Sequence, residues 1–258
     1  MKLFDSHCHL QWHEDQDPVP ARLQRAKDAG VAACICVGVD IPSSKRACKL
    51  STQHEMVYSS VGLHPNDLPE NRVELEEQLS LVQELSQDPS CIAIGETGLD
   101  FFRDQSDPDL QRESFRRHLE IASDVDLPVI IHCRDAYPEA AQLLENFGAP
   151  ISGVMHCWSS GPDHVQAFLD LGLHISFAGN ASYPKSEELR ESARIVPSSR
   201  ILIETDAPFL SPQPKRGKRN EPAYIRHTLD CLAETRSVSA EELAQTTWTN
   251  SMSLFGLK

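Results

Sequence analysis

Histidines and acidic residues recur in this sequence in short polar motifs, and each motif directly follows an apolar run. The histidines are His7, His9, His64, His132 and His156, and the acids are Glu96 and Asp206. Imidazole together with carboxylate is a ligand set that proteins use for Zn²⁺, Mn²⁺ and Fe²⁺. A metal centre built from these side chains would activate water for hydrolysis.

The spacing of His7-Cys8-His9 supports this interpretation. Alternate residues of an extended chain point to the same side, so both imidazoles can face one ion while Cys8 points away. Taken alone, such a pair is as often two packed or surface histidines, so the interpretation depends on the acids that join it. Glu96 is the candidate bridge, because one carboxylate can offer an oxygen to each of two ions.

The apolar runs before these motifs have the character of buried parallel strands. The expected strands are Leu3–Ser6, Ala32–Val39, Val57–Gly62, Ile92–Gly95, Val129–His132, Gly153–His156, His174–Phe177 and Ile201–Glu204. The segments between them have helical periodicity, as in Leu110, Phe115, Leu119 and Ala122. Eight strand–helix units in this length favour one α/β domain, residues 1–258, folded as a (β/α)8 TIM barrel.

In such a barrel the carboxyl ends of all strands meet on one face, which would bring the polar motifs together. An open doubly wound sheet is the second candidate fold. It is less favoured, because no glycine-rich phosphate loop follows the first strand.

Charge and composition limit the partners. The formal net charge is -14, which argues against a broad cationic surface for nucleic acid. No apolar stretch approaches the roughly 20 residues that span a membrane. The beginning, MKLFDSHCHL, has acid and histidine where a signal peptide has its apolar core. We therefore expect a cytoplasmic protein without a membrane partner.

The eight cysteines are Cys8, Cys34, Cys36, Cys48, Cys91, Cys133, Cys157 and Cys231. Their even number would permit a disulfide framework, but most lie in apolar runs, and without an export signal we expect reduced thiols. Cys8, Cys133 and Cys157 adjoin candidate ligands and are expected to point away from the metal.

One long loop, Ala207–Pro222, contains the basic run Lys215, Arg216, Lys218 and Arg219. On charge alone a solvated loop is the more ordinary interpretation. Its position after the last strand, beside the expected metal site, favours a contact with substrate phosphates instead.

Six motifs together resemble the TatD-type metal-dependent deoxyribonucleases. They are DSHCHL at the N-terminus, GLHP at 62–65, GETGLD at 95–100, HCRDA at 132–136, ETDAPFL at 204–210 and RGKRNEP at 216–222. The resemblance runs from the first strand to the last. It implies an amidohydrolase-like barrel with a binuclear metal centre. Two segments, Trp158–Gly161 and Asn180–Pro184, depart from the commoner family pattern, which bears on substrate choice.

The resemblance also implies roles for individual residues. One ion would be held by His7, His9, Glu96 and Asp206, and the other by Glu96, His132 and His156. Catalysis would depend on the bridging Glu96 and on Asp206 as general base. Substrate would be bound by His64, Arg134, Arg216 and Arg219, and the closing loop would be braced by Asn220 and Glu221.

The implied function is a hydrolase of phosphodiester bonds, a DNase with 3′–5′ exonuclease activity on single-stranded DNA or DNA ends. Two divalent ions would serve as cofactors, and the ligand types leave Mg²⁺, Mn²⁺ and Zn²⁺ open. One alternative is an amide, lactone or small phosphodiester hydrolase of the same superfamily. Another is a non-catalytic, metal-stabilised partner protein, although structural zinc sites are closed and usually rich in cysteine.

Overall fold

The computed structural model describes residues 1–103 and 105–258, in which parallel strands and helices alternate along the chain. The strands are β1 (Leu3–Cys8), β2 (Val31–Val37), β3 (Val57–Val61), β4 (Cys91–Asp100), β5 (Val129–Arg134), β6 (Gly153–Met155), β7 (His174–Phe177) and β8 (Ile201–Ile203). The α-helices are α1 (Val19–Asp28), α2 (Ile41–Gln53), α3 (Arg72–Leu85), α4 (Pro108–Val125), α5 (Tyr137–Phe147), α6 (Val165–Asp170), α7 (Glu187–Ile195), α8 (Ile225–Arg236) and α9 (Ala240–Leu254).

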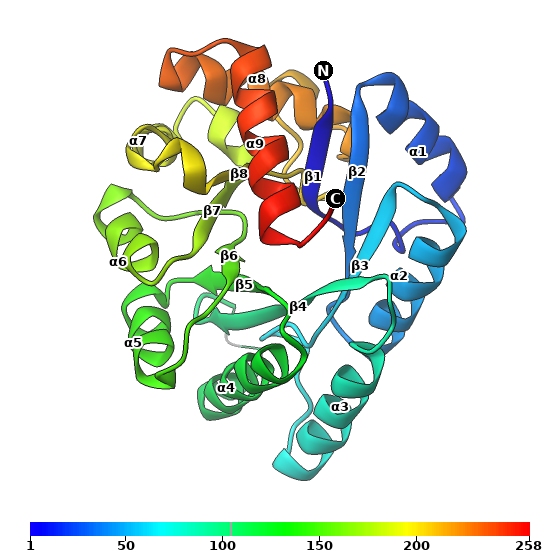
Figure 1. Ribbon diagram of the computed structural model, residues 1–258, viewed down its shortest axis with the longest axis vertical. Coiled ribbons are helices and arrows are strands. Elements are labelled where there is room, and N and C mark those ends of the chain that lie inside the picture. Colours follow the sequence, from blue (N-terminus) through cyan, green and yellow to red (C-terminus); the bar gives the residue numbers. More distant parts are fainter. Residues whose placement is uncertain (104) are drawn as a thin grey trace.

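The strands form one parallel sheet in the order β1 to β8, and helices α1 to α8 follow one another around it (Figure 1). The sheet closes where β8 meets β1. At this seam Cys8 bridges to Ala207, the N–H of Asp206 donates to the carbonyl of His7 (2.9 Å), and the N–H of His9 donates to that of Ala207 (2.8 Å). The TIM barrel is confirmed, because a doubly wound sheet would reverse its strand order.

Helix α4 illustrates how the sequence forms these elements. The carboxylate of Asp107 accepts hydrogen bonds from the N–H groups of Asp109 and Leu110 and caps the first turn. Leu110 and Phe115, on the periodic apolar stripe, are buried against the barrel. The capped, amphipathic helix therefore covers the strands that carry the polar motifs.

Three strands continue past the end that the sequence predicted, and β4 does so by the most residues. Strand β4 was expected to end at Gly95 but continues to Asp100, with an irregular register between Ile94 and Thr97 where it pairs with β5. Strands β1 and β5 also run on, to Cys8 and Arg134. Strands β2, β3, β6 and β8 end one or two residues earlier than expected. Apolar runs mark only the fully apolar part of a strand, so polar residues that continue the hydrogen-bond ladder are missed.

Glycines allow the strands to approach closely at the polar motifs. A Cβ on Gly62 would lie 2.6 Å from the carbonyl carbon of Gly95, next to Glu96. Gly98 has a φ of +137°, and a Cβ there would lie 1.9 Å from the carbonyl oxygen of His132. Only glycine fits such contacts, which bring β3, β4 and β5 together beneath the site.

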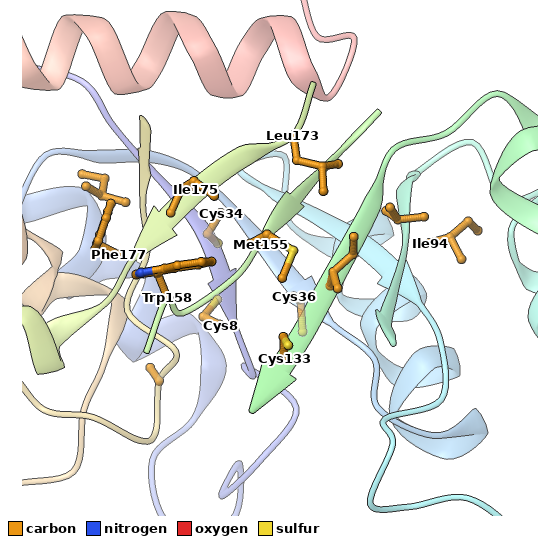
Figure 2. Close-up of a cluster of buried hydrophobic side chains, with 14 of the residues drawn as sticks. Cys8, Cys34, Cys36, Ile94, Cys133, Met155, Trp158, Leu173, Ile175 and Phe177 are labelled. Atoms are coloured by element: carbon orange, nitrogen blue, oxygen red, sulfur yellow. The ribbon is translucent and has the colours of Figure 1, made fainter. Parts of the chain in front are cut away.

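All eight cysteines are free thiols, as expected. Figure 2 shows Cys8, Cys34, Cys36 and Cys133 among buried apolar side chains such as Ile175. Among the described residues, no helix is both long and apolar enough to cross a membrane.

Candidate metal centre

The polar motifs converge at the carboxyl ends of the strands, as the barrel predicts. On the side formed by β1 and β8, Nε2 of His7 lies 3.2 Å from Nε2 of His9. The same His7 nitrogen lies 3.3 Å from Oε2 of Glu96, and Nε2 of His9 lies 3.5 Å from Oδ1 of Asp206. Two imidazoles and two carboxylates therefore face one point.

A second group forms on the side of β5 and β6. Nδ1 of His132 and Nε2 of His156 lie 3.3 Å apart. They lie 3.0 Å and 2.9 Å from Oε1 of Glu96. Glu96 thus offers one oxygen to each group, which is the geometry expected of a bridging carboxylate. His64 adjoins the second group, with its Nε2 3.4 Å from Oε1 of Glu96.

Hydrogen bonds orient the rings from behind. Nδ1 of His9 donates to the carbonyl of Val37 (3.0 Å), which leaves the lone pair of Nε2 directed at the first group. Nδ1 of His64 accepts from the N–H of Asn66 (3.1 Å), so in its neutral form this ring carries its proton on Nε2. His64 is therefore arranged as a hydrogen-bond donor, whereas His9 is arranged as a ligand.

Two supporting carboxylates received no role from the sequence. Oδ2 of Asp100 lies 3.1 Å from Nε2 of His132, and Oε1 of Glu204 lies 3.1 Å from Nδ1 of His156. Asp100 lies within GETGLD and Glu204 within ETDAPFL. The sequence did contain a signal for both. In an extended strand, residues two or four positions apart point to the same side, so Glu204 shares the side of Asp206, and Asp100 shares the side of Glu96.

Burial and neighbouring charge set the protonation of the cluster. Burial alone would raise the pKa of Glu96, but His156, His64 and His7 outweigh it and hold this pKa well below its usual value. Burial would lower the pKa of His156, yet Glu96 and Glu204 raise it well above the usual range. For His64 burial prevails and lowers the pKa to about 3. The centre thus favours ionised carboxylates and attracts positive charge.

Backbone geometry at the seam fixes Asp206. This residue has a φ of 53°, a left-handed backbone conformation that is uncommon for residues other than glycine. Next to it, Thr205 donates its N–H and its hydroxyl to the carboxyl of Asp5, at 2.8 Å and 2.6 Å. Burial raises the pKa of Asp5 to about 8. Asp5 thus braces the seam without facing an imidazole nitrogen.

The cluster opens into a cavity of about 700 Å³. His64 and Arg134, two of the expected substrate residues, line it. Arg216 and Arg219 are not among its lining residues. The guanidinium of Arg216 lies 4.4 Å from the centre of the Tyr183 ring, and that of Arg219 donates to Gln16 (2.6 Å). The structure therefore brings together the first two residues and leaves the other two on the outer loop.

Asn220 and Glu221 hold that loop in place. The side-chain amide of Asn220 is buried and donates to the carbonyls of Thr205 (2.8 Å) and Phe209 (2.6 Å). Glu221 accepts from Nε of Arg25 (2.7 Å), which links the loop to helix α1. These contacts match the bracing role that the family resemblance implied.

The cysteines beside the ligands are absent from the converging groups that the described residues form. The thiol of Cys8 donates to the carbonyl of Ile35 (3.3 Å), as alternation predicted. Cys157 lines the cavity, and burial raises the pKa of its thiol well above its usual value, which keeps it protonated. A protonated thiol is a poor metal ligand.

Comparison with known proteins gives the same family as the sequence motifs. The family model described as TatD related DNase matches residues 4–256. The chain is 36% identical to the uncharacterized metal-dependent hydrolase YabD of Bacillus subtilis, over 98% of both proteins. It is 38% identical to a protein of Escherichia coli named 3′-5′ ssDNA/RNA exonuclease TatD, over 99% of both.

A solved structure extends the likeness to three dimensions. The TatD homologue YjjV of Escherichia coli has a TM-score of 0.91 and 30% identity, covering 99% of this chain and 98% of that chain. The match to the family model is equally complete, since it omits only five residues at the ends. The chain is therefore a metal-dependent hydrolase that belongs to the TatD-related DNase family.

Proposed function

We propose that this hydrolase is a two-metal phosphodiesterase that removes nucleotides from the 3′ end of single-stranded DNA. The observation that carries the proposal is the position of Glu96 between two groups of imidazoles. Its Oε1 lies 2.9 Å from Nε2 of His156 and its Oε2 lies 3.3 Å from Nε2 of His7. One carboxylate so placed can serve two ions at once.

The donor set fits divalent cations. With Nδ1 of His9 donating to a carbonyl, the lone pair on its Nε2 faces His7 and Asp206, an arrangement of donors that positive charge stabilises. His7, His9 and Asp206 would hold one ion, His132 and His156 the other, and Glu96 both. Bound ions would polarise the phosphoryl oxygen, lower the pKa of the attacking water and neutralise the leaving oxyanion.

Asp206 is suited to act as the general base. Its side chain is 14% exposed, more than those of Glu96 or His7, and it lines the cavity. Burial would raise the pKa of Asp206, but the neighbouring imidazoles of His9, His7 and His156 lower it overall. An ionised, accessible carboxylate can accept the proton of the attacking water.

His64 and Arg134 would bind the phosphate. The neutral ring of His64 has its proton on Nε2, which faces the cluster, so it can donate to a phosphoryl oxygen. The guanidinium of Arg134 lines the same cavity, and its permanent charge favours an anion there. In this proposal both groups would contact the phosphate rather than an ion.

The substrate follows from charge and from access. A net charge of -14 leaves little attraction for a long duplex, so binding must come from the metal centre and a few local groups. A cluster at the base of a cavity of about 700 Å³ suits a strand end better than the middle of a duplex. The relative named as an exonuclease of single-stranded nucleic acid supports this choice.

The test uses protein freed of metal by chelation, checked by elemental analysis, and then supplied with Mg²⁺, Mn²⁺ or Zn²⁺. Three substrates are compared: a linear single strand, the same strand blocked at its 3′ end, and a closed circle. We expect cleavage of the linear strand alone, only after metal is restored. Equal cleavage of all three would reject the exonuclease, and cleavage of none would favour the small-molecule hydrolase.

A further inference from the structure

Two exposed aromatic side chains lie where the cavity opens. Phe102 is 58% exposed and Phe209 is 51% exposed, and both line the cavity that contains the ligand cluster. Among the described residues, the other exposed large apolar side chains are Met1, Val73 and Ile195, and none of these lines it. Exposed aromatic side chains that line a polar cavity are typical of sites that bind a ligand.

On one side of the mouth, Phe102 is paired with an arginine. The guanidinium carbon of Arg134 lies 3.7 Å from the centre of the Phe102 ring, in stacking contact with one face. More than half of the surface of Phe102 nonetheless stays exposed. A flat apolar surface therefore lies directly beside a fixed positive charge, a combination that matches a base and its neighbouring phosphate.

On the other side, Phe209 is held by a second aromatic contact. Its ring meets that of Trp12 edge to face, with centres 5.4 Å apart, and Trp12 stacks on His9 at 4.2 Å. The backbone of Phe209 is fixed as well, because its carbonyl accepts from the amide of Asn220 (2.6 Å). Phe209 is thus positioned by the same residues that position the metal cluster.

The two aromatic groups flank the cluster. Trp12 follows β1 and Phe209 follows β8, on either side of the seam, whereas Phe102 follows β4 and Arg134 ends β5. Because the strands run in order around a closed barrel, β4 and β5 lie across from β8 and β1. A strand whose phosphodiester reaches the cluster would carry its bases past both groups.

We propose that Phe102 and Phe209 are stacking surfaces for unpaired nucleobases on the two sides of the reacting phosphodiester. This inference rests on the proposed function and adds the residues that select single strands. Each base stacked on an aromatic side chain strengthens binding roughly 5- to 150-fold, whatever its identity. Bases in a duplex already stack on one another and are unavailable, so these surfaces favour single strands without reading sequence.

The experiment compares a single-stranded oligonucleotide with one whose three 3′-terminal residues are abasic, at fixed Mn²⁺ and with the full chain. For the unaltered protein, we expect the abasic strand to have a KM about 10-fold or more higher, with kcat little changed. Phe102→Ala and Phe209→Ala should raise KM for the intact strand and leave KM for the abasic strand unchanged. Phe102→Tyr and Phe209→Tyr should keep the low KM. Ile195→Ala, an exposed change away from the cavity, is the control for both strands.

Equal KM values for the two strands would overturn the stacking proposal while leaving the phosphodiesterase intact, because both strands would be cleaved. An increase of KM on both strands in Phe102→Ala would also contradict it, since the ring would then act only by holding Arg134. Cleavage of neither strand by the unaltered protein would overturn the stacking proposal together with the proposed function.

Discussion

The two sides of the metal centre are built differently. On the side of β5 and β6, carboxylates support both rings: Asp100 holds His132 and Glu204 holds His156. On the side of β1 and β8, His9 is held by a backbone carbonyl, and Nδ1 of His7 has no hydrogen-bond partner among the residues that the structure describes. The side of β1 and β8 also includes Asp206, which is more exposed than Glu96.

This difference indicates a division of labour. A carboxylate that accepts a hydrogen bond from one ring nitrogen makes the lone pair of the other ring nitrogen more basic. It also fixes the orientation of the imidazole, and both effects strengthen metal binding. We therefore expect the ion beside His132 and His156 to be bound more tightly. The ion beside His7 and His9 would be bound more weakly and lie next to Asp206, where the water is deprotonated.

Replacing the bridge should abolish the distinction between the two sides. We expect Glu96→Ala to lose at least one ion and to reduce activity to near background, because Glu96 is the residue that both groups share. Metal content and rate are measured on the same sample. Glu145→Ala, an exposed change on α5, is the control. Two retained ions with normal activity would show that the sides are independent of Glu96.

Replacing the base should separate chemistry from metal binding. Asp206→Asn keeps the shape of the side chain but accepts a proton poorly, so we expect a rate loss of roughly 10²-fold or more with most metal retained. Asp126→Asn makes the same change at a similar φ, 54° against 53°, at the end of α4. A normal rate of cleavage by Asp206→Asn would show that Asp206 is not the general base.

Replacing the supporting carboxylates should weaken one side only. Asp100→Asn and Glu204→Gln are expected to lower the affinity for one of two ions by about 10- to 100-fold, as measured by titration calorimetry. Asp5→Asn is the matched control, because Asp5 contacts Thr205 rather than a ring nitrogen. Equal weakening of both ions would contradict the division of labour.

The smallest effect concerns a histidine outside the centre. Nε2 of His118 accepts the N–H of Leu63 (3.1 Å) beside His64, and burial lowers the pKa of His118 to about 4. Because the folded pKa lies below the unfolded value of 6.5, this neutral ring stabilises the fold above pH 6.5. The contribution, on the order of 3 kcal/mol, is lost as pH falls from 6.5 to 4.

Urea unfolding across this pH range measures the effect. In the unaltered protein, stability should fall more steeply from pH 6.5 to 4 than in His118→Gln, whose side chain does not titrate there. Parallel pH profiles for the two proteins would show that His118 contributes nothing to the pH dependence.

The sequence predicted the fold and the meeting of the polar motifs, because apolar runs and the alternation of strands with helices are local signals. It did not predict that β4 continues to Asp100, since the continuation depends on glycines that let neighbouring strands approach. The role of Glu204 was missed although it adjoins a predicted ligand. Strand alternation places Glu204 on the same side as Asp206, but it does not identify His156, on another strand, as the partner of Glu204.

The basic run is the converse case, and its role in substrate binding stays a prediction. Arg216 and Arg219 attracted attention by their charge, yet they contact Tyr183 and Gln16 outside the lining of the cavity. Phe102 and Phe209 attracted none, because an aromatic residue in a sequence is expected to be buried. Exposure at a particular place is a property of the folded chain.

The most direct test of the account is calorimetric titration of metal-free protein with Mn²⁺, with bound metal counted by elemental analysis. We predict two ions per chain in two classes of unequal affinity, and loss of at least one ion in Glu96→Ala. A single ion per chain, or two ions of equal affinity that Glu96→Ala leaves in place, would contradict a bridged centre with two distinct sides.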